Sequence, residues 1–153
     1  MNSKVKKICI NGIIAAAYCA LSYLFLPISF GPIQVRIAES LCLLCFFRRE
    51  YSIGITIGCI LANLYSAFTL TPLDLLFGTL ASFVSCLLVS FSKHLGIAML
   101  FPIIINPLLV GAEFIIIGTS NAYWWMVGMI MIGEATIIVI SYILYLFIMK
   151  KDL

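Results

Sequence analysis

Long apolar runs, separated by only short breaks, constrain this chain more than any other feature of its sequence. The breaks fall at 27–32, 48–50, 69–74, 93–96 and 118–122. Hydrophobic residues make up 64% of the 153 residues and charged residues only 10%, whereas a soluble domain carries about 25% charged residues. Such a chain has too little polar surface to enclose its own core in water. A water-soluble fold is therefore excluded, and the lipid bilayer is the expected solvent.

Five breaks divide the chain into six apolar segments, and a membrane-spanning helix needs about 20 residues. The sequence predicts an all-α integral membrane protein, a single domain over 1–153. The six transmembrane helices are expected at 8–26, 36–47, 51–70, 73–91, 95–117 and 123–149. The second is short, because about 12 helical residues rise only about 18 Å. We expect it to begin below the outer surface, with the segment 27–35 dipping into the membrane above it as a candidate lid.

The distribution of Lys and Arg orients these helices. Basic residues collect in cytoplasmic connections, and with six spans every Lys and Arg except Arg36 falls on one side of the membrane. Both termini are therefore predicted to be cytoplasmic. Arg36 breaks the rule, and a charge inside or at the outer side of the membrane is a functional candidate. No basic patch suited to nucleic acid is present.

Polar side chains within the apolar segments are the candidates for a binding site, because a charge at a helix centre costs about 2.5–3.5 kcal/mol. They crowd the outer half of the predicted bundle. Helical spacing places Asn106 with Glu113, and Tyr123 with Glu134, on shared helix faces. We expect these faces to line one polar cavity that opens outward. The predicted ligand-binding residues are Gln34, Arg36, Glu39, Asn63, Asp74, Asn106, Glu113, Tyr123 and Glu134.

The composition of this set predicts a planar ligand that is rich in hydrogen-bond donors, and a cationic ligand of this kind also fits. Carboxylates outnumber the single Arg, amides are present, and aromatic residues such as Phe30 and Tyr65 lie at the same level. A carboxylate accepts two N–H groups from one edge of a heterocycle, an Asn reads a mixed donor and acceptor edge, and an aromatic ring stacks on the ligand.

Structural roles remain open for some of these residues. Asn63 and Asn106 are equally suited to hydrogen bonding between helices. Arg36 and Glu39, one helical turn apart, are suited to a local ion pair. Asp74 is suited to capping the start of a helix.

The sequence lacks the motifs of catalysis and of ATP use. It contains no P-loop, no HExxH and no GxSxG. Cys42 and Cys45 form a CxxC pair without the second ligand pair that structural zinc needs, so packing is the better interpretation. We therefore expect no enzyme activity, no metal and no cofactor.

Small residues on the first helix form a candidate docking face. Ala16 and Ala20 make a small-xxx-small pair on which another helix can pack closely. The surrounding run is rich in Ala, so Ala15 with Cys19 is an alternative register. Packing within the chain is equally compatible with this spacing.

Several stretches resemble the QueT queuosine-precursor transporter family, whose members are substrate-binding S components of energy-coupling factor (ECF) transporters. The most specific stretch is 31–41 (GPIQVRIAESL), and supporting ones are 58–64 (GCILANL), 74–80 (DLLFGTL), the surroundings of Asn106, and Gly133 with Glu134. The resemblance covers most of the chain. It implies a six-helix S component in the plasma membrane of a prokaryote.

The resemblance also implies a ligand and partners. The ligand is a 7-deazaguanine base captured outside the cell, in the aminomethyl form or as queuine, and the partners are a transmembrane coupling protein and two ATPase subunits. Ala16 and Ala20 are then the docking face. Which of the four carboxylates accepts the N–H edge of the base stays open, as does the choice of Asn63 or Asn106 for its carbonyl edge. Two alternatives remain: a self-sufficient proton-coupled carrier using Glu113 and Glu134, and an S component for another vitamin-like heterocycle.

Overall fold

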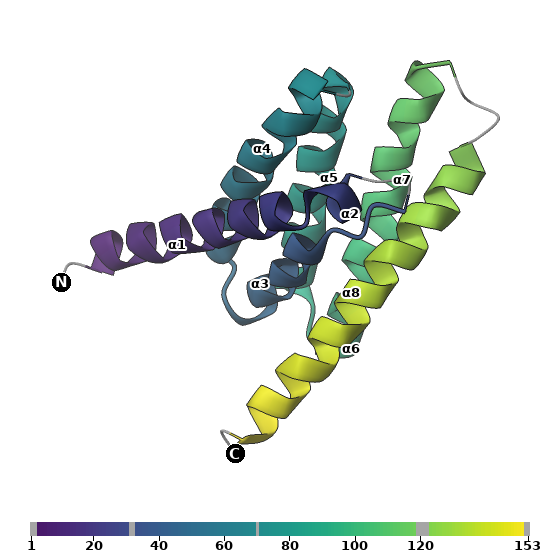
Figure 1. The fold of residues 1–153 in the computed structure, drawn as a ribbon. Coiled ribbons are helices and arrows are strands. Elements are labelled where there is room, and N and C mark those ends of the chain that lie inside the picture. Colours follow the sequence, from purple (N-terminus) through teal and green to yellow (C-terminus); the bar gives the residue numbers. More distant parts are fainter. Residues whose placement is uncertain (1–2, 31–32, 70, 119–122, 152–153) are drawn as a thin grey trace.

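The computed structural model describes residues 3–30, 33–69, 71–118 and 123–151, and the regular structure within these ranges is entirely helical (Figure 1). The helices in chain order are α1 (Ser3–Leu24), α2 (Leu26–Ser29), the 3₁₀ helix η1 (Ile37–Leu43), α3 (Leu44–Phe47), α4 (Tyr51–Thr69), α5 (Pro72–Phe91), α6 (Leu95–Ala98), α7 (Leu100–Ile116) and α8 (Tyr123–Lys151). Five segments are long and apolar enough to cross a membrane: Ser3–Leu24, Tyr51–Thr69, Pro72–Phe91, Leu95–Glu113 and Tyr123–Ile148. The predicted all-helical class is confirmed, and the chain is a multi-pass membrane protein.

Local signals explain where the helices begin. Pro72 occupies the first turn of α5, where its missing N–H costs nothing, and the hydroxyl of Thr71 accepts from the backbone N–H of Leu73 at 3.3 Å. Thr71, rather than Asp74, therefore caps this helix. At the other end of the chain α1 begins at Ser3, five residues before the predicted start, because the basic residues that precede the apolar run continue the helix.

The predicted short helix at 36–47 is present, but most of it is 3₁₀ rather than α. Three residues of a 3₁₀ helix rise about 6 Å, as do four residues of an α-helix. Every third residue of η1 therefore meets every fourth residue of α5. Glu39 accepts a hydrogen bond from Ser82, and Cys42 contacts Cys86 one turn further on. This matched register accounts for a 3₁₀ run of seven residues, which is longer than usual.

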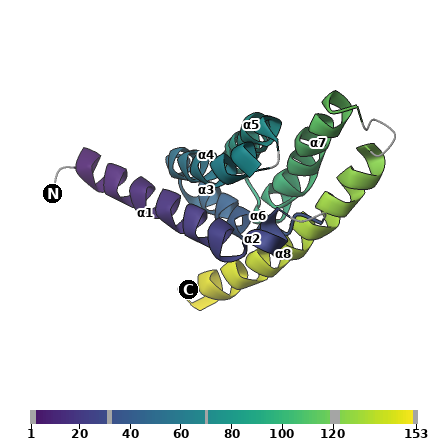
Figure 2. The same cartoon turned by 45° about the horizontal axis from the view of Figure 1, so that its top comes forward.

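The long helices pack in series, and η1 lies among them. α1 packs on α4, α4 on α5, α5 on α7 and α7 on α8, while η1 contacts α1, α5 and α8. Two views show α1 running at a steep angle to α8, with its N-terminal half extending beyond the other helices (Figures 1 and 2). The segment 33–47 thus reaches the centre of the molecule, where residues from four elements can meet.

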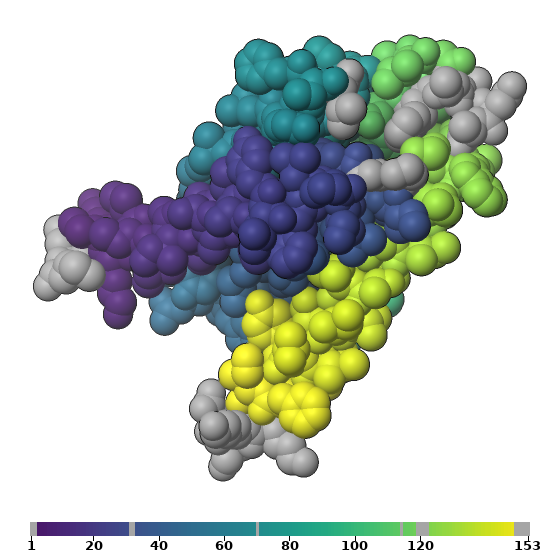
Figure 3. Space-filling view, in the orientation of Figure 1, coloured from purple at the N-terminus to yellow at the C-terminus, as the bar shows by residue number. Residues whose placement is uncertain are grey.

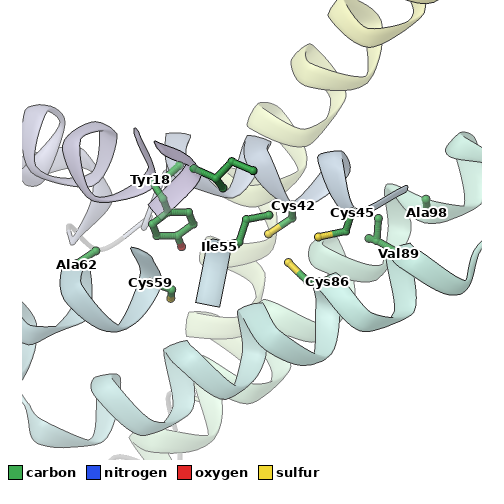
Figure 4. Close-up of a cluster of buried hydrophobic side chains, with 11 residues drawn as sticks. Tyr18, Cys42, Cys45, Ile55, Cys59, Ala62, Cys86, Val89 and Ala98 are labelled. Atoms are coloured by element: carbon green, nitrogen blue, oxygen red, sulfur yellow. The ribbon is translucent and has the colours of Figure 1, made fainter. Parts of the chain in front are cut away.

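The largest buried apolar cluster lies where α1, η1, α3, α4 and α5 meet (Figure 4). Cys42, Cys45 and Cys86 belong to this cluster (Figure 4), and all three cysteines are free and fully buried. No group of described residues is arranged to hold a metal ion. The three cysteines pack together in this cluster, and the thiol of Cys42 also donates to Glu39.

Candidate functional site

A buried ion pair joins the start of η1 to the first turn of α5. Nη2 of Arg36 lies 2.9 Å from Oδ1 of Asp74, and both side chains are less than a tenth exposed. The guanidinium also lies 5.7 Å from the ring of Phe30. The other two nitrogens of Arg36, Nε and Nη1, are buried without a hydrogen-bond partner. The ion pair of Arg36 is thus formed with Asp74 and not with Glu39, which was the local alternative that the spacing left open.

Gly78 provides the space in which this ion pair forms. A Cβ atom at position 78 would lie 2.7 Å from Nδ2 of Asn63 and 3.1 Å from both Nη1 of Arg36 and Oδ1 of Asp74. Only glycine admits these three side chains at such range. Asn63 itself donates to the backbone carbonyl of Asp74 at 3.4 Å and to the sulfur of Cys59 at 3.3 Å. Asn63 thus joins α4 to α5, which is the structural role that its position left open.

Glu39 is completely buried, and both of its carboxylate oxygens accept hydrogen bonds within the protein. Oε1 accepts from the hydroxyls of Tyr18 and Ser82, and Oε2 accepts from the thiol of Cys42 at 2.7 Å. The donors come from α1, α5 and η1 itself. Glu39 is therefore a junction between three elements, and its oxygens are already engaged without a ligand.

A second buried pair joins α7 to α8. Nδ2 of Asn106 donates to Oε1 of Glu134 at 2.8 Å, and both side chains are at most 2% exposed. Oδ1 of Asn106 and Oε2 of Glu134 have no hydrogen-bond partner. The helical spacing placed both residues on inward faces, and the structure brings them into contact. Each keeps one acceptor atom unused.

Glu113 and the segment before η1 extend this set of unused acceptors. Oε2 of Glu113 and Oε1 of Gln34 are both buried without a partner. Glu113 interacts electrostatically with Asp74 and Arg36, and Glu134 interacts with Glu39 and Arg36. The two buried pairs and Glu113 therefore belong to one electrostatic cluster.

The segment before η1 is fixed against α8. A Cβ atom at Gly133 would lie 2.5 Å from the carbonyl oxygen of Ile33 and 3.3 Å from that of Gln34, so the backbone of this segment touches α8 next to Glu134. Gln34 has a positive φ of 47°, which turns the chain toward η1. The backbone N–H of Val35 closes the turn by donating to Ile28 at 3.0 Å. Residues 31 and 32, which belong to the predicted lid, lie outside the described residues.

Tyr123 lies apart from these groups. Its hydroxyl donates to the carbonyl of Leu108 at 3.4 Å, its ring stacks edge-on against Trp124, and it packs on α7 at Gly111. Eight of the nine predicted residues are thus buried, and Tyr123 is only partly so. Of the eight, Glu39, Asn63 and Asp74 are engaged in bonds between elements. The other five have polar atoms without a partner: Gln34, Arg36, Asn106, Glu113 and Glu134.

Two cavities on other faces of the molecule differ in chemistry from this cluster. One, of about 610 Å³, lies between α4 and α5 and is lined by apolar side chains with Thr56 and Thr79. The other, of about 520 Å³, lies between α1 and α4 beside the ion pair of Lys7 and Glu50. Neither is lined by a residue of the predicted ligand site. Neither of these two cavities is therefore the predicted polar cavity, and where that cavity was expected the buried polar side chains pack against one another.

Sequence reasoning missed Tyr18, Ser82 and Gly78 as parts of the site. Ser82 and Gly78 follow Asp74 at spacings of eight and four on one face of α5, and that spacing was the available signal. Tyr18 gave a weaker signal, as the one aromatic residue in the Ala-rich part of α1. Tyr18 belongs to the site because it bonds Glu39 of η1, and no local sequence pattern identifies the helices that pack on η1.

The two registers of small residues on α1 have different environments. Ala16 and Ala20 are exposed, whereas Ala15 is buried against α4, where a Cβ atom at Gly58 would lie 2.8 Å from its carbonyl oxygen. Packing within the chain therefore accounts for Ala15. It leaves Ala16 and Ala20 uncovered.

The unused polar atoms define what the site can recognise. Nε and Nη1 of Arg36 are donors, and the unused oxygens are acceptors: Gln34 Oε1, Asn106 Oδ1, Glu113 Oε2 and Glu134 Oε2. Buried polar groups are normally paired, so a cluster of unpaired ones indicates a partner that brings the complementary atoms. Such a partner carries several N–H groups and at least one acceptor. The excess of carboxylates over the single guanidinium favours positive charge on it.

Comparison with known proteins bears on this chemistry. The sequence matches the family described as QueT transporter over residues 8–150. It is 38% identical over 84 residues to the Queuosine precursor transporter QueT of Lactococcus lactis subsp. cremoris (strain MG1363), an alignment that covers 54% of this chain and 48% of that protein. The chain thus aligns with about half the length of that curated relative. No solved structure matches the chain.

Proposed function

The chain belongs to the QueT transporter family, and from this premise we propose that it captures a queuosine precursor, a 7-deazaguanine base, in the cluster of unpaired polar groups around Arg36, Asn106 and Glu134. Because the members of this family are transporters, the chain is not assigned an enzyme activity. The observation that carries the proposal is that five buried side chains from the segment before η1, α7 and α8 retain unused donors or acceptors. A 7-deazaguanine base brings matching atoms on its edges.

The bonding assignments follow from which atoms are unused. Oε2 of Glu134 and Oδ1 of Asn106 accept from the N–H groups of the base, because both are acceptors from neighbouring helices joined at 2.8 Å. Nε and Nη1 of Arg36 donate to its carbonyl edge. Glu113, which interacts with Asp74 in a region already rich in negative charge, receives the cationic amine of an aminomethyl substituent. Asn63 and Glu39 support the site through Asp74 and η1, and Tyr123 supports the α7–α8 contact.

Calorimetric titration of the purified protein tests this proposal. The protein is titrated with the nitrile base, the aminomethyl base and queuine, and the titration is repeated with Glu134→Gln. We expect the substitution to weaken the best ligand by about tenfold or more, because a hydrogen bond to a charged group is worth about 1.5–3 kcal/mol. Thr136→Ala is the matched control, since Thr136 lies on the exposed face of the same helix and its hydroxyl donates to the backbone carbonyl of Ile132. Equal affinities for native protein and Glu134→Gln would place the ligand elsewhere.

We further propose that the chain acts as the single-domain S component of an ECF transporter in a prokaryotic plasma membrane. The short helix Ile37–Phe47 then counts as a sixth membrane segment, with both termini cytoplasmic and capture from the extracellular side. The partners are a transmembrane coupling protein and two ATPase subunits, and the exposed pair Ala16 and Ala20 supports docking on α1.

A second function, a self-sufficient proton-coupled carrier, is favoured by one observation: Glu113 and Glu134 each keep a buried unbonded carboxylate oxygen. Uptake into vesicles separates the two functions. An S component gives no accumulation of the base unless the coupling protein, the ATPases and ATP are present. A proton-coupled carrier accumulates the base in vesicles that contain this chain alone when the outside is made acidic.

A further inference from the structure

Arg36 lies one turn of η1 from Glu39, yet the two do not pair. In a 3₁₀ helix, side chains three residues apart lie on the same face, and Arg36 interacts electrostatically with Glu39. A fully buried carboxylate is the strongest available partner for a guanidinium with two unpaired nitrogens. Other contacts must therefore hold the Glu39 carboxylate away from the guanidinium of Arg36.

Three neutral donors hold it. The hydroxyls of Tyr18 and Ser82 bond Oε1 of Glu39, and the thiol of Cys42 bonds Oε2. Ser82 and Cys42 belong to the η1–α5 contact itself, so they move with Glu39. Tyr18 comes from α1, which packs on η1 from another side, and it is the only one of the three that bonds the carboxylate from outside the η1–α5 contact.

Tyr18 is itself rigidly placed. Tyr18 is 2% exposed, and a Cβ atom added at Gly58 would lie 2.7 Å from the Cβ of Tyr18, so α1 and α4 touch at this point. Figure 4 shows its hydroxyl directed into the cluster between α4 and η1. The Tyr18 ring cannot move away from Glu39 unless α1 and α4 separate. Its hydroxyl is therefore a fixed donor.

From this arrangement we infer that Tyr18 is a positioning residue for ligand binding: by engaging Glu39 it keeps that carboxylate from neutralising Arg36, so that two N–H groups of Arg36 remain available to the ligand. The inference rests on the proposed function for the role of Arg36. The state of Arg36 itself can be measured without any ligand. Tyr18 touches neither the ligand nor the unused acceptors of α7 and α8.

The ligand-free test uses nitrogen magnetic resonance of arginine side chains in the purified full chain. Arg36 shares the chain only with Arg48 and Arg49, so its Nε–H signal can be assigned by substitution. In Tyr18→Phe we expect that signal to move downfield, because the N–H of Arg36 then donates a hydrogen bond to the Glu39 carboxylate. In Tyr18→Phe with Glu39→Gln we expect the signal to return to its native position. Tyr23→Phe is the matched control, because Tyr23 lies on the same helix but donates to the carbonyl of Leu61.

The binding test uses the aminomethyl base as probe. Tyr18→Phe should bind it about tenfold more weakly, as expected for the loss of one charged hydrogen bond, and the double variant should recover to within about twofold of Glu39→Gln alone. A purely structural role for Tyr18 would make the double variant weaker still. An unmoved Arg36 signal in Tyr18→Phe, or a loss of affinity that Glu39→Gln does not restore, would overturn the inference. Failure of the native protein to bind any of the three bases would overturn the proposed function instead, and the resonance experiment would still decide the role of Tyr18.

Discussion

Buried charge is the dominant feature at the scale of single residues. Among the described residues, four carboxylates and one guanidinium lie inside the bundle with less than a tenth of their surface exposed: Glu39, Asp74, Glu113, Glu134 and Arg36. Isolated charges of this kind are costly in a membrane. The chain offsets the cost for Asp74 with an ion pair and for Glu39 with three donors. Glu113 and Glu134 are only partly compensated, because each keeps one carboxylate oxygen without a hydrogen-bond partner, and this supports their proposed role in ligand binding.

A residue-scale prediction concerns Glu50, which precedes the membrane segment Tyr51–Thr69. Lys7 lies 2.7 Å from Glu50 and, by its hydrogen bond, holds the pKa of Glu50 below its ordinary value of 4.5. Because the folded-state pKa is lowered, the stabilisation is present above pH of about 4.5 and is lost as the pH falls through the lower folded-state value. The difference in melting temperature between native protein and Glu50→Gln should therefore shrink from pH 7 to pH 3. The pair is largely exposed, so the effect is small.

Lys6→Met serves as the control, because Lys6 is exposed on the same turn of α1. It should follow the native pH profile. A constant difference between native protein and Glu50→Gln over this range would contradict the assignment.

At the scale of elements, the contact of η1 with α5 organises the site. The equal rise of three 3₁₀ residues and four α-helical residues keeps successive contacts in register. At the position where Arg36 crosses α5, that helix presents Gly78, and the side chain passes over it to reach Asp74. A larger residue at this crossing would displace the guanidinium.

Gly78→Ala tests this crossing. The added Cβ would lie 2.7 Å from Nδ2 of Asn63, so that side chain or its neighbours must shift. We expect a loss of about 1–3 kcal/mol of stability, as for overpacking in other cores. Gly128→Ala, in the second turn of α8 with nothing within 4 Å of the added atom, should be neutral or stabilising by up to about 1 kcal/mol. Chemical unfolding in detergent measures both. Equal effects of the two substitutions would show that the crossing is not tightly packed.

Much of the element level was predictable, because helix length and apolar runs are local properties. The predicted helix at 51–70 is α4, and the predicted helix at 73–91 is α5, each within one residue at either end. The 3₁₀ form of η1 was not predictable, since it depends on the register with α5, which is a tertiary property. Helical faces predicted that Asn106 and Glu134 point inward, but not that they pair with each other. The pairing of Arg36 with Asp74 was not predictable either, because the two residues are 38 positions apart and meet only through the contact of η1 with α5.

At the scale of the whole molecule, the exposed surface fits a lipid environment. Large apolar side chains are exposed along the long helices, and Trp124 and Trp125 at the start of α8 are more than two thirds exposed, as expected for an interfacial aromatic belt. Figure 3 shows the N-terminal part of α1 and the C-terminal part of α8 projecting from the body as separate arms. α1 thus buries one face on α4 and presents Ala16 and Ala20 on another.

A whole-molecule prediction follows for assembly. Ala16→Trp adds bulk to the exposed small-residue face of α1 and should abolish co-purification with the coupling protein and ATPases, because close helix packing needs small side chains. Binding of the base by the isolated chain should be unchanged. Ile140→Trp, at an exposed position of α8, is the control and should leave assembly intact. If Ala16→Trp still assembles, docking uses another surface.

A crystal structure of the purified chain with a bound base tests the proposed binding site. We expect a 7-deazaguanine ring enclosed by α7, α8 and the segment before η1, with Arg36, Asn106 and Glu134 within hydrogen-bond distance of its edges. A base found instead in the cavity between α4 and α5, or in the cavity between α1 and α4, with Arg36, Asn106 and Glu134 in their ligand-free positions, would contradict the proposed site.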